Sequence, residues 1–237
     1  MTGAARTLGG VALGGRPVVV AAGGEADVDA LVQARGAHVV ELRADLFAAP
    51  SPATVTAALQ RLRAAGRPIL LTVRAGAEGG GGDLDDGRRA AIYAAGLPLV
   101  DAIDVEAASE ALVRDLLPRA RAAGRLVLLS AHDFARTPPR DALLATIDRA
   151  FALGADVAKL AAHAAAPADL HALLETTLAA RTRGVATMAM GPLGPLSRLV
   201  LPAAGSLLTY AAAGAPTAPG QLPVAELAAL IARLFPA

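Results

Sequence analysis

The chain of 237 residues contains no cysteine and no tryptophan, and aromatic residues make up 3% of it. Without cysteine it can form no disulfide bond, no thiolate metal site and no cysteine nucleophile. The net charge is +1 at pH 7 and the basic residues are scattered, so no surface for nucleic acid is expected. The apolar content of 54% is mostly alanine, leucine and valine, which is enough for one sizeable core.

Long hydrophobic runs are also missing. Residues 199–225 carry no charge, but prolines and glycines interrupt them before the roughly 20 apolar residues that a membrane-spanning helix needs. Residues 1–15 are rich in glycine and too weakly apolar for a signal peptide. We therefore expect no membrane segment, and a cytoplasmic protein.

Lysine is nearly absent, because Lys159 is the only one and the other basic residues are arginine. It lies in "GADVAKLAAHA", residues 154–164, within an apolar run that is typical of a strand. A guanidinium stays protonated, whereas burial and neighbouring arginines favour loss of the proton from an amine. A need for a nucleophilic nitrogen would explain why this position is not arginine. The sequence therefore predicts a Schiff base between Lys159 and a carbonyl substrate.

Short apolar runs alternate with alanine- and leucine-rich amphipathic runs along the whole chain, which predicts parallel strands buried on both faces. Eight strand–helix units favour a (β/α)8 TIM barrel formed by one domain over residues 1–237, and an open doubly wound sheet is the alternative. The predicted strands are 17–22, 38–43, 68–74, 99–106, 126–132, 156–161, 185–190 and 207–211. The predicted helices are 27–35, 53–65, 85–95, 109–123, 140–153, 168–183 and 224–235, several of them ending before a glycine: Gly36, Gly66, Gly96, Gly124, Gly154 and Gly184.

Ionisable side chains recur at the ends of these strands, where the active site of a barrel forms. His132 ends the strand that precedes Lys159, so the two should be neighbours, and a neutral imidazole is suited to proton transfer near pH 7. The other strand-end residues are Glu41, Arg43, Arg74, Asp104, Glu106, Met188 and Met190.

Loops supply further candidates. The glycine-dense residues 74–87 lack the motif of a phosphate-binding loop and instead carry Glu78. Residues 214–223 have the proline and glycine content of a closing loop, with Thr217 and Gln221 as its polar contacts. Arg198 follows the seventh strand, where barrels often bind anionic groups. No spacing of histidine and carboxylate residues is typical of a metal site.

The motifs "ELRADLF", "LTVRAGAEGG", "AIDVE", "SAHDF", "DVAKL", "MAMGPLGPLSR" and "TAPGQL" occur in this order over residues 16–235. Together they resemble the type I 3-dehydroquinate dehydratases of the shikimate pathway. The resemblance implies a TIM barrel, usually a homodimer, that acts on a small molecule, 3-dehydroquinate, without metal or organic cofactor.

By this resemblance Lys159 forms the imine with the C3 ketone, His132 is the general acid and base, and Glu78 orients His132 and tunes its pKa. Arg198 matches the clamp for the substrate carboxylate. The remaining matches bind substrate or line the pocket: Glu41, Arg43, Arg74, Thr217, Gln221, Met188, Met190 and Tyr210. The chain departs from the family pattern at Leu42, Ala131, His163 and Thr217.

Two other functions stay open at this point. A class I aldolase or transaldolase also uses a barrel lysine, but it cleaves carbon–carbon bonds, and "GPLGPLSR" is a poor phosphate-binding site. A catalytically silent barrel could serve as a binding module, although it would have no need for Lys159, His132 and Glu78 together.

Overall fold

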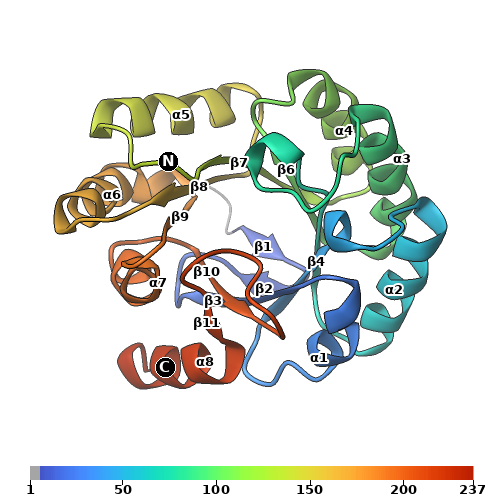
Figure 1. The fold of residues 1–237 in the computed structure, drawn as a ribbon, viewed down its shortest axis with the longest axis horizontal. Helices are drawn as coiled ribbons and strands as arrows, with labels where there is room; N and C mark the ends of the chain where they lie inside the picture. The colour runs from blue at the N-terminus through green and yellow to red at the C-terminus, as the bar shows by residue number, and fades with distance from the viewer. Residues whose placement is uncertain (1–5, 237) are drawn as a thin grey trace.

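The computed structural model describes residues 6–236 and forms a parallel sheet curled into a barrel and surrounded by helices (Figure 1). Eight strands make the barrel in chain order, and β10 pairs with β3 to join the two ends of the chain. The (β/α)8 TIM barrel is therefore confirmed, and the open doubly wound sheet is wrong. The barrel strands are β3 (Val18–Gly23), β4 (Val39–Arg43), β5 (Ile69–Thr72), β6 (Ala102–Glu106), β7 (Leu126–Asp133), β8 (Val157–His163), β9 (Val185–Met190) and β10 (Leu208–Ala212).

Eight α-helices cover the outside of the barrel, and none within residues 6–236 is long and apolar enough to cross a membrane. They are α1 (Val28–Val32), α2 (Pro52–Ala64), α3 (Asp86–Gly96), α4 (Glu110–Ala122), α5 (Arg140–Ala152), α6 (Pro167–Ala180), α7 (Gly194–Ala203) and α8 (Val224–Leu234). Short 3-10 helices occur at η1 (Glu25–Asp27), η2 (Ala44–Leu46), η3 (Gly76–Glu78), η4 (Leu97–Leu99) and η5 (Arg181–Arg183).

Alternate residues of each strand face the inside and the outside of the barrel. On β4, Val39 belongs to the inner apolar cluster, whereas Val40 and Leu42 pack outward against the helices. On β8, Ala158 packs outward in the same way, and Lys159 faces inward. This alternation carries the polar strand-end residues into the mouth of the barrel.

Two features complete the barrel. Between β9 and β10 the strands are linked by the Leu207 amide, which donates to the Val185 carbonyl at 2.8 Å. At the opposite end from the polar residues, a short hairpin of β1 (Thr7–Leu8) and β2 (Val11–Ala12) buries Leu8 in the inner cluster with Leu70 and Leu128. The hairpin therefore covers the floor of the barrel.

The structure corrects the expected elements in three places. Helix α7 forms where no helix is predicted. Pro195 lies in its first turn, where no amide partner is lost, and the Arg198 carbonyl that Pro202 cannot bond accepts from the Thr209 hydroxyl at 2.9 Å. Strand β11 (Leu222–Pro223) adds a short ninth strand beside β10. Gly96 does not follow the end of a helix as expected, because it is itself the last residue of α3, with φ of −78°. A Cβ at this position would lie 2.5 Å from Leu71.

Candidate active site

A cavity opens at the carboxyl ends of the barrel strands. It collects every side chain that the sequence assigns to catalysis or substrate binding: Glu41, Arg43, Arg74, Glu78, His132, Lys159, Met190, Arg198, Tyr210, Thr217 and Gln221. The same cavity is also lined by Gly79, Phe134, Ala161, Met188 and Ala218. Residues far apart in the chain thus meet at one place because they end neighbouring strands.

Lys159 is held at the bottom of this cavity with 6% of its surface exposed. Its Nζ atom donates to Oδ2 of Asp104 at 2.6 Å and lies 3.7 Å from Oε1 of Glu41. The same nitrogen is 4.4 Å from the centroid of the Tyr210 ring, which is a cation–π distance. Lys159 thus pairs with two carboxylates, whereas the sequence led us to expect arginines around it.

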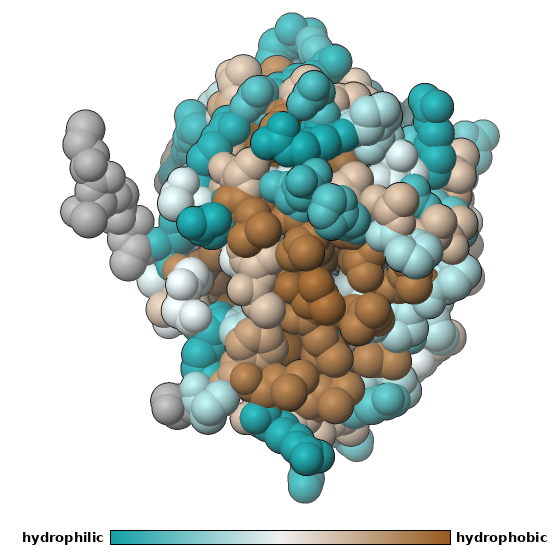
Figure 2. All heavy atoms as spheres, turned by 90° about the vertical axis from the view of Figure 1, so that its left-hand side faces the viewer, coloured by the Kyte–Doolittle hydropathy of each residue, from teal (hydrophilic) through white to brown (hydrophobic). Residues whose placement is uncertain are grey.

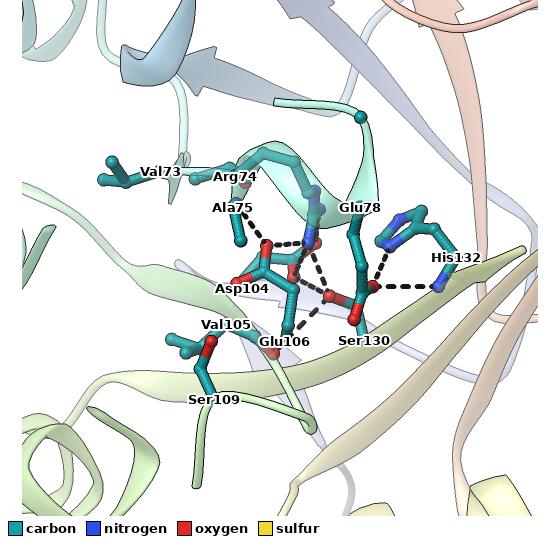
Figure 3. Close-up of polar contacts among 12 residues, drawn as sticks. Val73, Arg74, Ala75, Glu78, Asp104, Val105, Glu106, Ser109, Ser130 and His132 are labelled. Atoms are coloured by element: carbon teal, nitrogen blue, oxygen red, sulfur yellow. Dashed lines mark hydrogen bonds and ion pairs between the residues drawn. The ribbon is translucent and has the colours of Figure 1, made fainter. Parts of the chain in front are cut away.

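A buried network of alternating charges supports the lysine (Figure 3). Arg74 donates to Oδ2 of Asp104 at 3.0 Å and to Oε1 of Glu106 at 2.6 Å. Ser130 donates to Oδ1 of Asp104 at 2.6 Å, and Arg89 of α3 pairs with the other oxygen of Glu106. Although burial raises the pKa of Asp104, Arg74 and Lys159 lower it below its usual value, so Asp104 stays ionised beside the lysine.

Glu78 and His132 form a second pair at the mouth of the cavity (Figure 3). Oε2 of Glu78 accepts a hydrogen bond from the backbone amide of His132 at 2.9 Å and lies 2.9 Å from the ring atom Nδ1. Two contacts to one residue fix the carboxylate relative to the imidazole. The ring atom Nε2 is left to face the cavity that His132 lines.

Burial shifts the pKa values of Glu78 and His132 in opposite directions. Burial, assisted by the charge of Glu106, raises the pKa of Glu78 to about 7. Burial, assisted by the cations Arg74 and Lys159, lowers the pKa of His132 well below its usual value of 6.5. The imidazole is therefore neutral near pH 7, and the contact with Glu78 is a hydrogen bond of a neutral ring and not a salt bridge. A neutral imidazole can accept a proton, as a general base must.

The loop that carries Glu78 is held by a buried carboxylate that the sequence did not indicate. Asp45 accepts hydrogen bonds from the backbone amides of Arg74 at 3.0 Å and Gly81 at 3.0 Å, on the two sides of η3. It also forms a two-point ion pair with Arg43, with distances of 2.9 and 2.7 Å. Asp45 thereby sets the position of Glu78 from the neighbouring strand end.

The opposite wall of the cavity carries Arg198 and Tyr210, which are 1% and 2% exposed. The three guanidinium nitrogens of Arg198 have no hydrogen-bond partner within residues 6–236. Burial lowers the pKa of Arg198 to about 10, which still leaves it charged near pH 7. Next to this wall, the closing loop is held by the backbone amide of Thr217, which donates to Gln221 at 2.8 Å.

The sequence missed the roles of several residues. The sequence identifies Asp104 and Glu106 as strand-end residues, but it does not show that both pair with Arg74 or that Asp104 contacts Lys159. Arg89 lies on a helix outside the barrel and gives no sequence signal. In the described part of the chain, no three histidine, aspartate or glutamate side chains are arranged to hold a metal ion.

Comparison with known proteins shows the family of the chain. The family model described as type I 3-dehydroquinase matches residues 18–235. A 3-dehydroquinate dehydratase from Methanosarcina acetivorans is 37% identical over 202 residues, which cover 81% of this chain and 84% of the relative.

Two solved structures share the fold over nearly their full length. The 3-dehydroquinate dehydratase from Geobacillus kaustophilus HTA426 has a TM-score of 0.87 at 28% identity, with 100% of this chain and 99% of that chain covered. The type I 3-dehydroquinate dehydratase from Clostridium difficile, solved with covalently modified comenic acid, has the same TM-score and identity, with 96% of each chain covered. The resemblance inferred from the motifs is thus confirmed, and the chain belongs to the type I 3-dehydroquinase family.

Proposed function

We propose that this protein dehydrates 3-dehydroquinate to 3-dehydroshikimate through a Schiff base on Lys159. The observation that carries the proposal is a single buried lysine in a cavity that also holds a neutral histidine with a carboxylate partner. Family membership supplies the substrate class. The mechanism as proposed needs no metal or organic cofactor.

Imine formation is the first step. Lys159 loses a proton to a group in the cavity, adds to the C3 ketone, and the carbonyl oxygen leaves as water. The product is a protonated imine, whose positive charge replaces that of the ammonium beside Asp104, 2.6 Å away. Asp104 therefore stabilises both the resting lysine and the iminium. The covalently modified comenic acid in the Clostridium difficile relative supports covalent chemistry in this family.

Elimination follows from the iminium. His132 removes a proton from C2, and the electron pair forms a C2–C3 double bond as the iminium nitrogen becomes neutral. The electrons then return to form a C1–C2 double bond while the C1 hydroxyl leaves as water, with its proton from His132. Hydrolysis of the imine restores the ketone and frees Lys159. The overall reaction releases one water.

The remaining cavity residues match the polar groups of the substrate. Arg198 is charged, buried and without a protein partner in residues 6–236, as expected of a group that binds the substrate carboxylate. Glu41, Arg43 and Arg74 are suited to the hydroxyl groups on the other side of the ring. Thr217 and Gln221 would contact the substrate from the closing loop.

The test is to incubate the protein with 3-dehydroquinate, reduce with borohydride and map the adduct by mass spectrometry. A mass gain on Lys159, together with enone absorbance in the absence of borohydride, is the expected result. An adduct that forms with a sugar phosphate and not with dehydroquinate would instead indicate an aldolase. No adduct with either compound would indicate a silent barrel.

We also propose that the protein is a homodimer joined through an apolar face on α6 and α7. Figure 2 shows apolar side chains gathered on the side of the molecule where these helices lie. Leu170, Leu174 and Leu178 recur four residues apart along one side of α6, and Leu178 and Leu196 are 43% and 49% exposed. A second copy that presents the same surface could cover these leucines.

Sedimentation velocity tests the dimer. Leu178→Glu should give a monomer, because a buried charge would be left without a partner at the interface. Gln60→Glu adds the same charge on α2, at the far side of the barrel, and should remain a dimer. A monomeric native protein would contradict the proposal.

The proposed setting of the reaction is the shikimate pathway in the cytoplasm, in one (β/α)8 domain. Family membership supports the pathway, and a chain without cysteine is compatible with a reducing compartment.

A further inference from the structure

Four buried side-chain nitrogen or oxygen atoms lack a hydrogen-bond partner within residues 6–236, and they belong to only two residues. Three are the guanidinium nitrogens of Arg198, and the fourth is the phenolic oxygen of Tyr210. Both residues line the catalytic cavity. Buried polar atoms are nearly always paired, so unpaired ones that face a cavity mark where a ligand binds.

The chain has two tyrosines, and comparing them shows that a buried tyrosine hydroxyl need not lack a partner in this protein. Tyr93 is completely buried on α3, and its hydroxyl accepts from the amide of Val73 at 2.9 Å and donates to the carbonyl of Asp104. Tyr210 is buried to nearly the same degree, with no such partner in the described chain. Tyr93 is therefore structural, whereas the hydroxyl of Tyr210 is directed to the cavity.

We propose that the Tyr210 hydroxyl donates a hydrogen bond to the same substrate carboxylate that Arg198 binds, which makes Tyr210 a specificity-determining residue and not only a part of the pocket wall. This inference rests on the proposed function, since it concerns the substrate of that reaction.

The chemistry of the two side chains selects a carboxylate. A guanidinium is a donor without acceptor capacity, so its partner must offer oxygen lone pairs, preferably with negative charge. A carboxylate has about four lone-pair sites, and a guanidinium fork uses two of them. The remaining lone pairs can accept from a neutral hydroxyl at its side. A hydroxyl is the suitable second donor there, because it adds no charge next to Lys159 and Arg198.

The surroundings keep this hydroxyl protonated. Burial, together with the nearby carboxylates of Glu41 and Asp104, raises the pKa of Tyr210 well above its usual value. The oxygen of Glu41 that lies towards Lys159 already accepts from Thr72 at 2.7 Å. The ring is fixed by the Lys159 ammonium, 4.4 Å from its centroid. The phenol is thus a preorganised donor whose partner comes from the ligand.

The test uses Tyr210→Phe, which keeps the ring and removes only the hydroxyl. The Michaelis constant for 3-dehydroquinate should rise roughly tenfold, the loss typical of a hydrogen bond to a charged group, while kcat changes by less than about threefold. The inhibition constant of quinate, which has the carboxylate but no ketone, should rise by the same factor. An unchanged Michaelis constant, or a fall in kcat alone, would overturn the assignment.

A double-mutant cycle with Arg198→Lys tests whether the two residues share one group. If both bind the same carboxylate, the combined increase in the Michaelis constant should differ from the product of the single increases by about threefold or more. Increases that simply multiply would show separate substrate oxygens and overturn the shared site.

Two controls separate the possible failures. Tyr93→Phe should lower the melting temperature, because it leaves a buried amide and carbonyl unpaired, whereas Tyr210→Phe should not. An equal loss of stability in both variants would show a structural role for Tyr210 and refute the inference. Native enzyme that does not turn over dehydroquinate would refute the proposed function itself, whereas active native enzyme with an unaffected Tyr210→Phe variant would refute only this inference.

Discussion

Asp104 on β6 and Lys159 on β8 form a buried ion pair of 2.6 Å across the intervening strand β7. The carboxylate holds the lysine nitrogen in position, and in the proposed mechanism it faces the iminium after the amine has reacted. Asp104 in turn is held by Arg74 and Ser130. Lys159 is thus positioned by residues from three other strands or their ends.

Replacing Asp104 with asparagine should impair both folding and catalysis. Removing one partner of a buried ion pair leaves Lys159 and Arg74 undercompensated, which should cost about 3–5 kcal/mol in the free energy of unfolding. Urea denaturation measures this loss, and borohydride trapping should show slower adduct formation on Lys159. Asp148→Asn, in an exposed ion pair with Arg183, should cost about 1 kcal/mol or less. Similar losses in the two variants would contradict the importance of the buried pair.

Lys159→Arg should have no measurable turnover, and neither should Lys159→Ala. Arginine can keep the charge beside Asp104, but its guanidinium cannot form the imine. Continuous measurement of enone absorbance with dehydroquinate checks this expectation, and circular dichroism verifies the fold of each variant. A Lys159→Arg enzyme that works at the native rate would refute covalent catalysis.

His132→Ala should separate imine formation from elimination. Loss of a general acid and base lowers kcat by roughly 10²–10⁴-fold. Lys159 and its partner Asp104 are untouched, so part of the protein should still form an adduct that borohydride traps and mass spectrometry detects. A variant that keeps more than about a tenth of the native kcat would exclude His132 as the main proton carrier.

Glu78→Gln should change how stability depends on pH. The pKa of Glu78 is raised from 4.5 to about 7 on folding, so the folded state binds this proton more tightly than the unfolded state. The stability that this proton provides is present at low pH and is lost as the pH rises through 7. The free energy of unfolding of Glu78→Gln, relative to that of the native protein, should therefore be higher at pH 8 than at pH 5.

Urea denaturation at both pH values measures that difference. Glu226→Gln, an exposed substitution on α8, serves as the control and should show the same stability difference from the native protein at pH 5 and pH 8. A Glu78→Gln variant whose relative stability falls with rising pH would show that the carboxylate is favoured in its charged form.

The sequence predicts the fold and most of the cavity because both depend on short-range patterns. Alternating apolar runs define eight strands, and the last polar residue of each must reach the barrel mouth. Lys159 and His132 could therefore be assigned to one site before their surroundings were known. The closing loop with Thr217 and Gln221 is recognisable in the same way, from its composition and its place after the last barrel strand.

The contacts between these residues depend on geometry that the sequence does not encode locally. The pairing of Lys159 with Asp104 depends on the registers of β6 and β8 against β7, which lies between them. The clamp that Asp45 forms on the η3 loop requires two backbone amides to point towards β4. Helix α7 escaped prediction because the hydroxyl of Thr209, distant in the sequence, replaces the hydrogen bond that Pro202 cannot make.

The hairpin that buries Leu8 covers the base of the barrel, at the opposite end from the cavity. In the proposed reaction, dehydroquinate therefore enters and dehydroshikimate leaves at the open end, beside Thr217 and Gln221. Accumulated product would accordingly compete with fresh reactant for the free enzyme.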